Sequence, residues 1–148
     1  MPKRLVAIDP GRSTGFVDIT LDEDGPGITH AAVVSWDDRF SLEQLIYGRE
    51  AMANGPPDAI VVESFRLFAN KAAEQVGEEF PSVRVIGLVE LVAHQHNHLD
   101  RIFFQQPAVR KRIQIKEPFK SQLPKSPHAR DAFQHARYYW IMKLGVKI

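Results

Sequence analysis

Two short apolar runs that each end on a carboxylate are the feature of this sequence that most restricts its fold. The first, RLVAID (4–9), is followed by the turn residues PGRST, and the second, DAIVVES (58–64), contains Glu63. A short apolar run between turn residues is typical of a strand that is buried on both faces. Such strands lie inside a sheet covered by helices, so these runs predict an α/β fold.

The segments around these runs predict further strands and a helix. GFVDITL (15–21) and HAAVVSW (30–36) are rich in β-branched residues and are separated by the turn residues DEDGPG. With the first run they predict an antiparallel meander of three strands. Ser41 is a candidate N-cap for a helix over 42–53, whose apolar residues recur at helical spacing.

The second half of the chain predicts two more helices and a fifth strand. Pro81 marks a break or a new start in a helix that should reach about His98, and RIFFQQ (101–106) predicts a strand. The segment 107–126 contains three prolines and no sustained apolar period, so we expect mostly loop there. A final helix should begin with Ser126 as its N-cap and end near residue 145.

The order β-β-β-α-β-α-β-α predicts a five-stranded mixed sheet with helices packed on it. A parallel crossover should join the first strand to the fourth through a helix. A length of 148 residues suits one domain, 1–148. The chain has no cysteine, which excludes disulfides and thiolate chemistry, and no apolar run approaches the ~18 residues of a membrane span. We therefore expect a soluble, cytoplasmic protein.

The charge is divided unevenly along the chain. Residues 1–100 hold 8 Lys/Arg and 16 Asp/Glu, whereas residues 101–148 hold 11 Lys/Arg and 2 Asp/Glu. A basic segment is either a solvated surface or a site for a polyanion. We favour a site for a polyanion, because the carboxylates of residues 1–100 indicate a phosphate substrate.

Four side chains have the chemistry and the spacing of a metal site. If the first and fourth strands are neighbours, Asp9 and Glu63 lie one strand spacing apart, roughly 5 Å, which is close enough to share a divalent cation. His128 and Asp131 are three residues apart and project from one face of the last helix. Three carboxylates and one imidazole suit Mg²⁺ and also Mn²⁺. Two such ions about 4 Å apart can activate a water and stabilise the leaving oxygen of a phosphodiester, which is nuclease chemistry.

Three motifs resemble those of a known family. AIDPGRSTGF (7–16), IVVESF (60–65) and HARDAFQHA (128–136) are similar in type, order and spacing to the acidic motifs of the RuvC-type Holliday-junction resolvases, within the RNase H-like superfamily. The resemblance covers nearly the whole chain. It implies a homodimer that binds a four-way junction in DNA recombination and repair and makes paired incisions. It also implies that two Mg²⁺ ions, or Mn²⁺, are held by Asp9, Glu63, His128 and Asp131.

The resemblance also suggests which residues contact DNA. In the family an aromatic residue after the strand-ending Glu meets the junction centre, and Phe65 and Phe68 are its candidates here. Basic side chains of the 107–126 segment are expected to contact phosphates, as are two residues of the first turn. These are Lys111, Arg112, Lys116, Lys120 and Lys125, with Arg12 and Ser13. The segment lacks the family's glycine-lysine turn and extra helix, so no sequence preference is carried over.

Several alternative interpretations remain. The same site could belong to an RNase H-like nuclease that cuts flaps or RNA–DNA hybrids, or the chain could bind junctions without cutting them. Four clustered ligands favour an enzyme, because carboxylates repel DNA phosphates. His94 and His98 have the spacing of a helical zinc pair but lack a third ligand, so a polar helix end is favoured. Phe133 and the aromatic residues 138–140 are expected to pack in the core or in a dimer interface.

Overall fold

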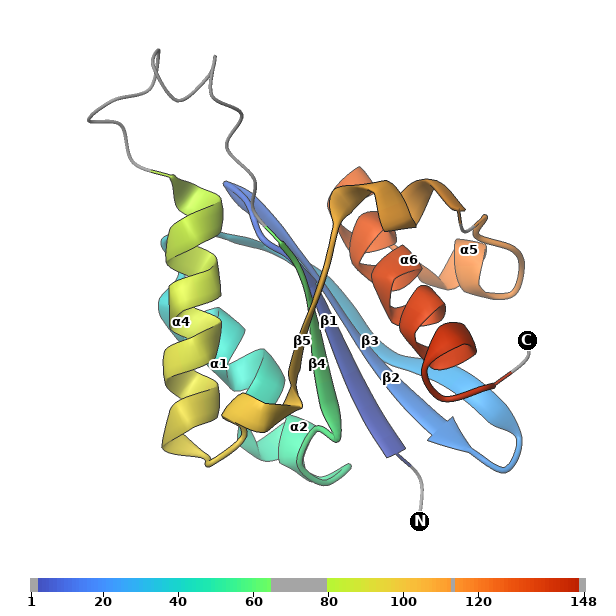
Figure 1. The fold of residues 1–148 in the computed structure, drawn as a ribbon, viewed down its shortest axis with the longest axis horizontal. Helices are drawn as coiled ribbons and strands as arrows, with labels where there is room; N and C mark the ends of the chain where they lie inside the picture. The colour runs from blue at the N-terminus through green and yellow to red at the C-terminus, as the bar shows by residue number, and fades with distance from the viewer. Residues whose placement is uncertain (1–2, 65–79, 113, 147–148) are drawn as a thin grey trace.

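The computed structural model describes residues 3–64, 80–112 and 114–146 (Figure 1). Its centre is a mixed sheet of five strands in the order β3-β2-β1-β4-β5. β1 pairs antiparallel with β2, β2 pairs antiparallel with β3, and β1–β4 and β4–β5 are parallel pairs. The predicted meander and the parallel crossover are thereby confirmed. The strands are β1 (Lys3–Asp9), β2 (Ser13–Asp22), β3 (Gly25–Ser35), β4 (Ala59–Glu63) and β5 (Ile102–Gln105).

Helices cover both faces of the sheet, as Figure 1 shows. One face carries α1 (Arg39–Tyr47) and α4 (Pro81–Gln95), and the other carries α6 (Pro127–Met142). Shorter helical segments complete the chain. They are α2 (Arg49–Met52), η1 (Leu99–Arg101), η2 (Pro107–Arg112) and α5 (Phe119–Gln122). None of the helices that the structure describes is both long and apolar enough to cross a membrane.

The helices on both faces of the sheet explain the continuous apolar run of β1. Leu5 and Ala7 belong to the core beneath α6, while Val6 and Ile8 belong to the core beneath α1 and α4. Because side chains alternate along a strand, Asp9 shares the α6 face with Ala7. The direction of the Asp9 side chain is therefore set by the register of a fully buried strand.

The helix predicted over 42–53 differs from the observed one at both ends. It begins at Arg39, because the carboxylate of Asp38 caps it by accepting hydrogen bonds from the backbone N–H and the hydroxyl of Ser41 (3.1 and 2.7 Å). It ends at Gly48, whose backbone is extended and so close to the preceding turn that a Cβ would lie 2.4 Å from the carbonyl oxygen of Gln44. The prediction of Ser41 as the N-cap is wrong by three residues.

The 107–126 segment is more structured than predicted. It contains η2 and α5, and the side chains of Phe119 and Leu123 are buried in the core beneath α6. The Phe119 ring lies 5.1 Å from that of Phe133 and 6.1 Å from that of Trp140, measured between centroids. Packing against α6 therefore fixes a segment that has no amphipathic period of its own.

A buried ion pair joins β1 to β2 on the α1 face. The guanidinium of Arg4 donates to both carboxylate oxygens of Asp18 (2.8–3.2 Å) and to the carbonyl oxygens of Leu45 and Gly55. Burial raises the pKa of Asp18, and the neighbouring guanidinium opposes that shift. Because the donors of Arg4 also reach the end of α1 and the loop before β4, the pair fixes these segments to the sheet.

Candidate active site

Three polar side chains form a row where the parallel strands end. Ile8 is paired with Val62 in the parallel register of β1 and β4, so the next residues, Asp9 and Glu63, end neighbouring strands. Glu63 is in turn paired with Gln105 at the end of β5. Adjacent strands lie about 4.8 Å apart, and alternation places all three side chains on the α6 face. Asp9 is only 7% exposed and Glu63 is half-buried.

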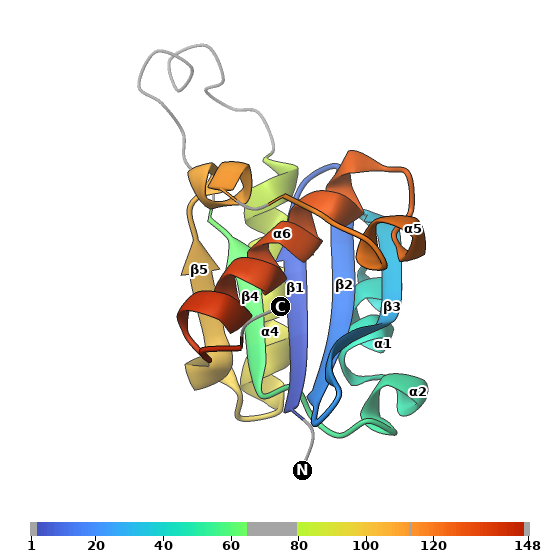
Figure 2. The same ribbon diagram turned by 90° about the vertical axis from the view of Figure 1, so that its right-hand side faces the viewer.

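Helix α6 crosses directly over this row. Its first turn rests on β2 at Gly15, the partner of Asp9 in the antiparallel register, where a Cβ would lie 1.9 Å from the carbonyl oxygen of His128. Seven residues further along α6, the side chain of His135 contacts Glu63 and Gln105. Seven residues of helix span about 10 Å, which is close to two strand spacings. Figure 2 shows the same diagonal path of α6 across β2, β1, β4 and β5.

The predicted ligands of α6 lie on the face that meets the row. Asp131 is three residues after His128 and four before His135, so the three side chains share one face of the helix. Asp131 is therefore positioned between the β2 end and the β4 end of the crossing. The structure thus brings Asp9, Glu63, His128 and Asp131 to one edge of the sheet, from two strands and one helix.

His135 is the member of this edge that the sequence prediction missed. Its ring is fully buried, with Nε2 2.7 Å from Oε2 of Glu63 and Nδ1 2.7 Å from Oε1 of Gln105. A carboxylate oxygen accepts, so Nε2 is the donor to Glu63. The signal was present in the sequence, because His135 follows Asp131 by four residues and so shares its face of the helix.

The turn after Asp9 is held from two sides. Within the turn, the hydroxyl of Thr14 donates to the carbonyl oxygen of Gly11 (2.9 Å). From the other layer, the hydroxyl of Ser82 in the first turn of α4 donates to the carbonyl oxygen of Pro10 (2.9 Å). These bonds fix the path of the chain on the carboxyl side of Asp9.

The donor set fits a divalent cation in kind. Asp9, Glu63 and Asp131 supply carboxylate oxygens and His128 supplies an imidazole nitrogen, a set that Mg²⁺ and Mn²⁺ accept. Within residues 3–64, 80–112 and 114–146, no group of three or more such side chains is arranged so that it could hold a metal ion. The four side chains therefore share an edge of the sheet without converging on one point.

The structure describes the side chains of some residues predicted to contact DNA, but not of all. Arg12 is exposed and Ser13 is half-buried at the start of β2, both close in sequence to Asp9. Lys116, Lys120 and Lys125 are exposed. The backbones of Lys111 and Arg112 belong to η2, which follows β5. Phe65 and Phe68 lie outside the described residues.

The histidine-rich stretch at the end of α4 has a structural role. His98 lies beyond the last helical residue, Gln95, so His94 and His98 do not form an i, i+4 pair on one helix. Instead the hydroxyl of Tyr47 is hydrogen-bonded to Nδ1 of His98 (2.8 Å), and the ring of His96 stacks on Tyr47 at 3.8 Å. The predicted polar helix end is confirmed. The predicted packing of the last helix is also confirmed, because Phe133 and Trp140 are fully buried.

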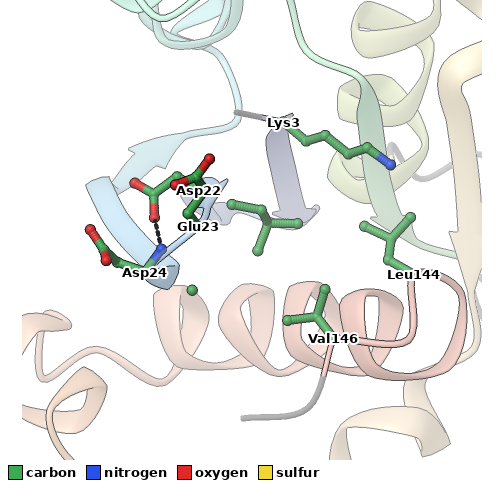
Figure 3. Close-up of a pocket in the computed structure, with 8 residues that line it drawn as sticks. Lys3, Asp22, Glu23, Asp24, Leu144 and Val146 are labelled. Atoms are coloured by element: carbon green, nitrogen blue, oxygen red, sulfur yellow. Dashed lines mark hydrogen bonds between the residues drawn. The ribbon is translucent and has the colours of Figure 1, made fainter. Parts of the chain in front are cut away.

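A pocket of about 580 Å³ lies at the other end of β1 from Asp9 (Figure 3). Lys3, the acidic turn between β2 and β3 and two apolar residues of the C-terminal segment, Leu144 and Val146, line it. The backbone N–H of Asp24 donates to the carboxylate of Asp22 (2.9 Å), so the Asp22 carboxylate closes the turn. Six residues of strand, or about 20 Å, separate Lys3 from Asp9, so this pocket is not part of the candidate active site.

Comparison with known proteins identifies the fold. No protein family model and no curated protein matches the chain. Among solved structures, RuvC of T. thermophilus in complex with a Holliday junction substrate matches with a TM-score of 0.61 and 19% identity, over 95% of this chain and 96% of that one. The fowlpox virus Holliday junction resolvase matches with a TM-score of 0.58 and 11% identity, over 93% and 96%. The chain therefore has the fold of these two resolvases over nearly its whole length.

Proposed function

We propose that this protein is a metal-dependent endonuclease that resolves four-way DNA junctions by paired hydrolysis of phosphodiester bonds. The observation that carries the proposal is the edge of the sheet at which Asp9 and Glu63 end neighbouring strands beneath the His128–Asp131 face of α6. The fold shared with two solved Holliday junction resolvases supports the junction as the substrate.

The ligands of the proposed site come from the sheet and from the helix that crosses it. Asp9 and Glu63 would hold cations from the rigid sheet, and Asp131 and His128 would complete the coordination from the helix above. Two bound Mg²⁺ or Mn²⁺ ions supply the activation of a water nucleophile and the stabilisation of the leaving oxygen. Strand ends suit this task because catalytic groups must be held to within about 0.5 Å of their productive geometry.

The basic segment that packs against α6 supports a DNA substrate. Lys116, Lys120 and Lys125 are exposed on the segment that packs against α6, and Arg12 is exposed in the turn after Asp9. Basic side chains of this kind contact phosphates and so position DNA without reading its sequence. They would offset the repulsion between the carboxylates of the site and the DNA backbone.

We also propose that two copies of the chain associate through α4. Val83 and Leu91 of this helix are 47% and 54% exposed, and Gly87 lies between them at the same helical spacing. Among the residues that the structure describes, a Cβ at Gly87 would meet no atom within 4 Å, so this stripe has room for a partner. A second copy on a two-fold axis would bury the apolar stripe and supply the second active site that paired cutting requires.

The test is cleavage of a synthetic four-way DNA junction in Mg²⁺, in Mn²⁺ and in chelator. Matched duplex, flap and RNA–DNA hybrid substrates serve as controls. We expect paired, symmetric nicks at the junction, in either metal and not in chelator. Cutting of the flap or the hybrid in preference to the junction would retain the nuclease site and contradict the proposed substrate. Tight binding of the junction without cutting in either metal would show a binding module.

A further inference from the structure

The most constrained polar side chain near the candidate site is one that the four-ligand scheme does not use. His135 is fully buried on α6, and both of its ring nitrogens lie 2.7 Å from a polar partner. Burying an imidazole is unfavourable unless its nitrogens are hydrogen-bonded. Both partners, Glu63 and Gln105, end strands of the row that faces α6.

We infer that His135 is a positioning residue, which holds the Glu63 carboxylate in the orientation in which it binds a divalent cation. This inference rests on the proposed function. The Nε2–H of His135 donates to Oε2 of Glu63, which leaves the carboxylate little freedom to rotate. Gln105 fixes the same ring from its other side through Nδ1.

The geometry matches the way proteins support metal ligands. Ligating carboxylates are themselves hydrogen-bonded, and loss of such a partner costs typically 10–100-fold in metal affinity or activity. Here the partners form a chain from β5 through α6 to β4, so three elements determine the position of one carboxylate. That arrangement fixes Glu63 more firmly than its place at a strand end alone would.

A purely structural role for His135 makes a different prediction. Phe133 lies two residues away on α6 and is also fully buried, but its neighbours are aromatic rings. Truncation of such a core residue lowers stability without changing how the folded protein binds a cation. The comparison of His135 with Phe133 therefore separates metal positioning from core packing.

The experiment measures Mn²⁺ binding to the DNA-free protein by electron paramagnetic resonance, together with the metal dependence of junction cleavage. The variants are His135→Leu, which removes both hydrogen bonds, His135→Gln, whose amide can still donate to Glu63, and the control Phe133→Leu. For His135→Leu we expect the metal concentration at half-maximal binding and at half-maximal cleavage to rise about 10–100-fold. For His135→Gln and Phe133→Leu we expect values close to the wild-type value.

Thermal unfolding shows whether each variant is folded, and Gln105→Leu is used if His135→Leu does not fold, with an increase in the same direction expected. If the wild type cuts junctions and these variants bind Mn²⁺ as it does, His135 is a core residue and the inference is overturned, while the proposed function stands. A wild type that neither binds Mn²⁺ nor cuts would overturn both.

Discussion

Two carboxylates of the candidate site, Asp9 and Glu63, are held by strands, and this determines what substitutions there can test. Asp9 is the last residue of β1, follows four fully buried residues and is itself 7% exposed. A side chain on such a strand cannot relax away from its neighbours as one on a loop can. Replacement of the charge without a change of shape therefore tests chemistry separately from folding.

Asp9→Asn should reduce junction cleavage to background while junction binding is retained. The amide keeps the shape of the side chain but is a poorer cation ligand than a carboxylate. Removal of one negative charge near DNA phosphates should leave binding unchanged or strengthen it by up to about 1 kcal/mol. Cleavage assays and gel-shift titrations in chelator measure the two effects.

The matched control for Asp9→Asn is Asp100→Asn. Asp100 is an exposed carboxylate in η1, before β5 and therefore at the opposite edge of the sheet. It should cut and bind as the wild type does. Loss of binding together with cleavage in Asp9→Asn would contradict the separation of roles.

The carboxylates could be predicted from the sequence, whereas the histidine that contacts one of them could be placed on the helix face of Asp131 but not paired with Glu63. Asp9 and Glu63 each end an apolar run, and that local pattern was sufficient to place them at strand ends. The contacts of His135 form only when α6 lies across β4 and β5, because its partners Glu63 and Gln105 are 72 and 30 residues away in sequence. Its identity as a partner of Glu63 is a tertiary property.

At the scale of elements, the site depends on how closely α6 approaches β2. Gly15 permits that approach, since any side chain there would overlap the backbone of His128. The rest of α6 packs in the core on the same face of the sheet, through Phe133, Ala136 and Trp140. A change in the contact between Gly15 and the backbone of α6 would move His128 and Asp131 together relative to Asp9.

Gly15→Ala should lower both stability and cleavage although Gly15 has no side chain to take part in chemistry. The added methyl group would lie 1.9 Å from a backbone oxygen, so the helix must shift. Overpacking of this kind costs about 1–3 kcal/mol, and a misplacement of about 1 Å can cost roughly 100-fold in rate. Thermal unfolding and junction cleavage report the two losses.

Gly27→Ala is the control for this substitution. Gly27 lies in β3, and a Cβ there would meet no atom within 4 Å. Stability and cleavage should stay near the wild-type values. Equal effects of the two substitutions would show that the contact between α6 and β2 is not what positions the site.

The bounds of a helix or strand could be predicted where residues nearby in sequence determine them. The break at Gly48 and the burial of α5 instead depend on close backbone approach and on packing against Phe133 and Trp140. Neither effect leaves a periodic signal in the sequence. The four-residue helix α5 lies in a proline-rich segment and therefore could not be predicted from the sequence.

At the scale of the whole molecule, the order of hydrophobic patterns was enough to predict the sheet. Three consecutive strands form the meander, and the crossover places β4 beside β1. The sequence showed the uneven charge but not where the charged residues lie in the folded molecule. Exposed lysines of the 107–126 segment lie on the layer of the sheet that carries α6, while the apolar stripe of α4 lies on the opposite layer.

Leu91→Glu should convert the proposed dimer to a monomer. Burial of a leucine side chain contributes about 1.5–3 kcal/mol for each subunit, and a carboxylate in its place would have to lose its hydration. Sedimentation velocity measures the mass. Paired nicks should become single nicks, at unchanged thermal stability of the subunit.

Met142→Glu is the matched control, because Met142 is 60% exposed near the end of α6 on the other layer. It should leave both the mass and the paired nicks unchanged. A Leu91→Glu variant that sediments as the wild type does would contradict association through α4.

The hydrogen bond from Ser82 to the carbonyl of Pro10 joins the two halves of this scheme. Ser82 belongs to the first turn of α4, the helix that carries the proposed contact with a second copy, and Pro10 directly follows Asp9. A shift of α4 would therefore be transmitted through this bond to the residue that follows Asp9. In the proposed dimer, contact between the two copies at α4 would therefore bear on the turn beside Asp9 in each subunit.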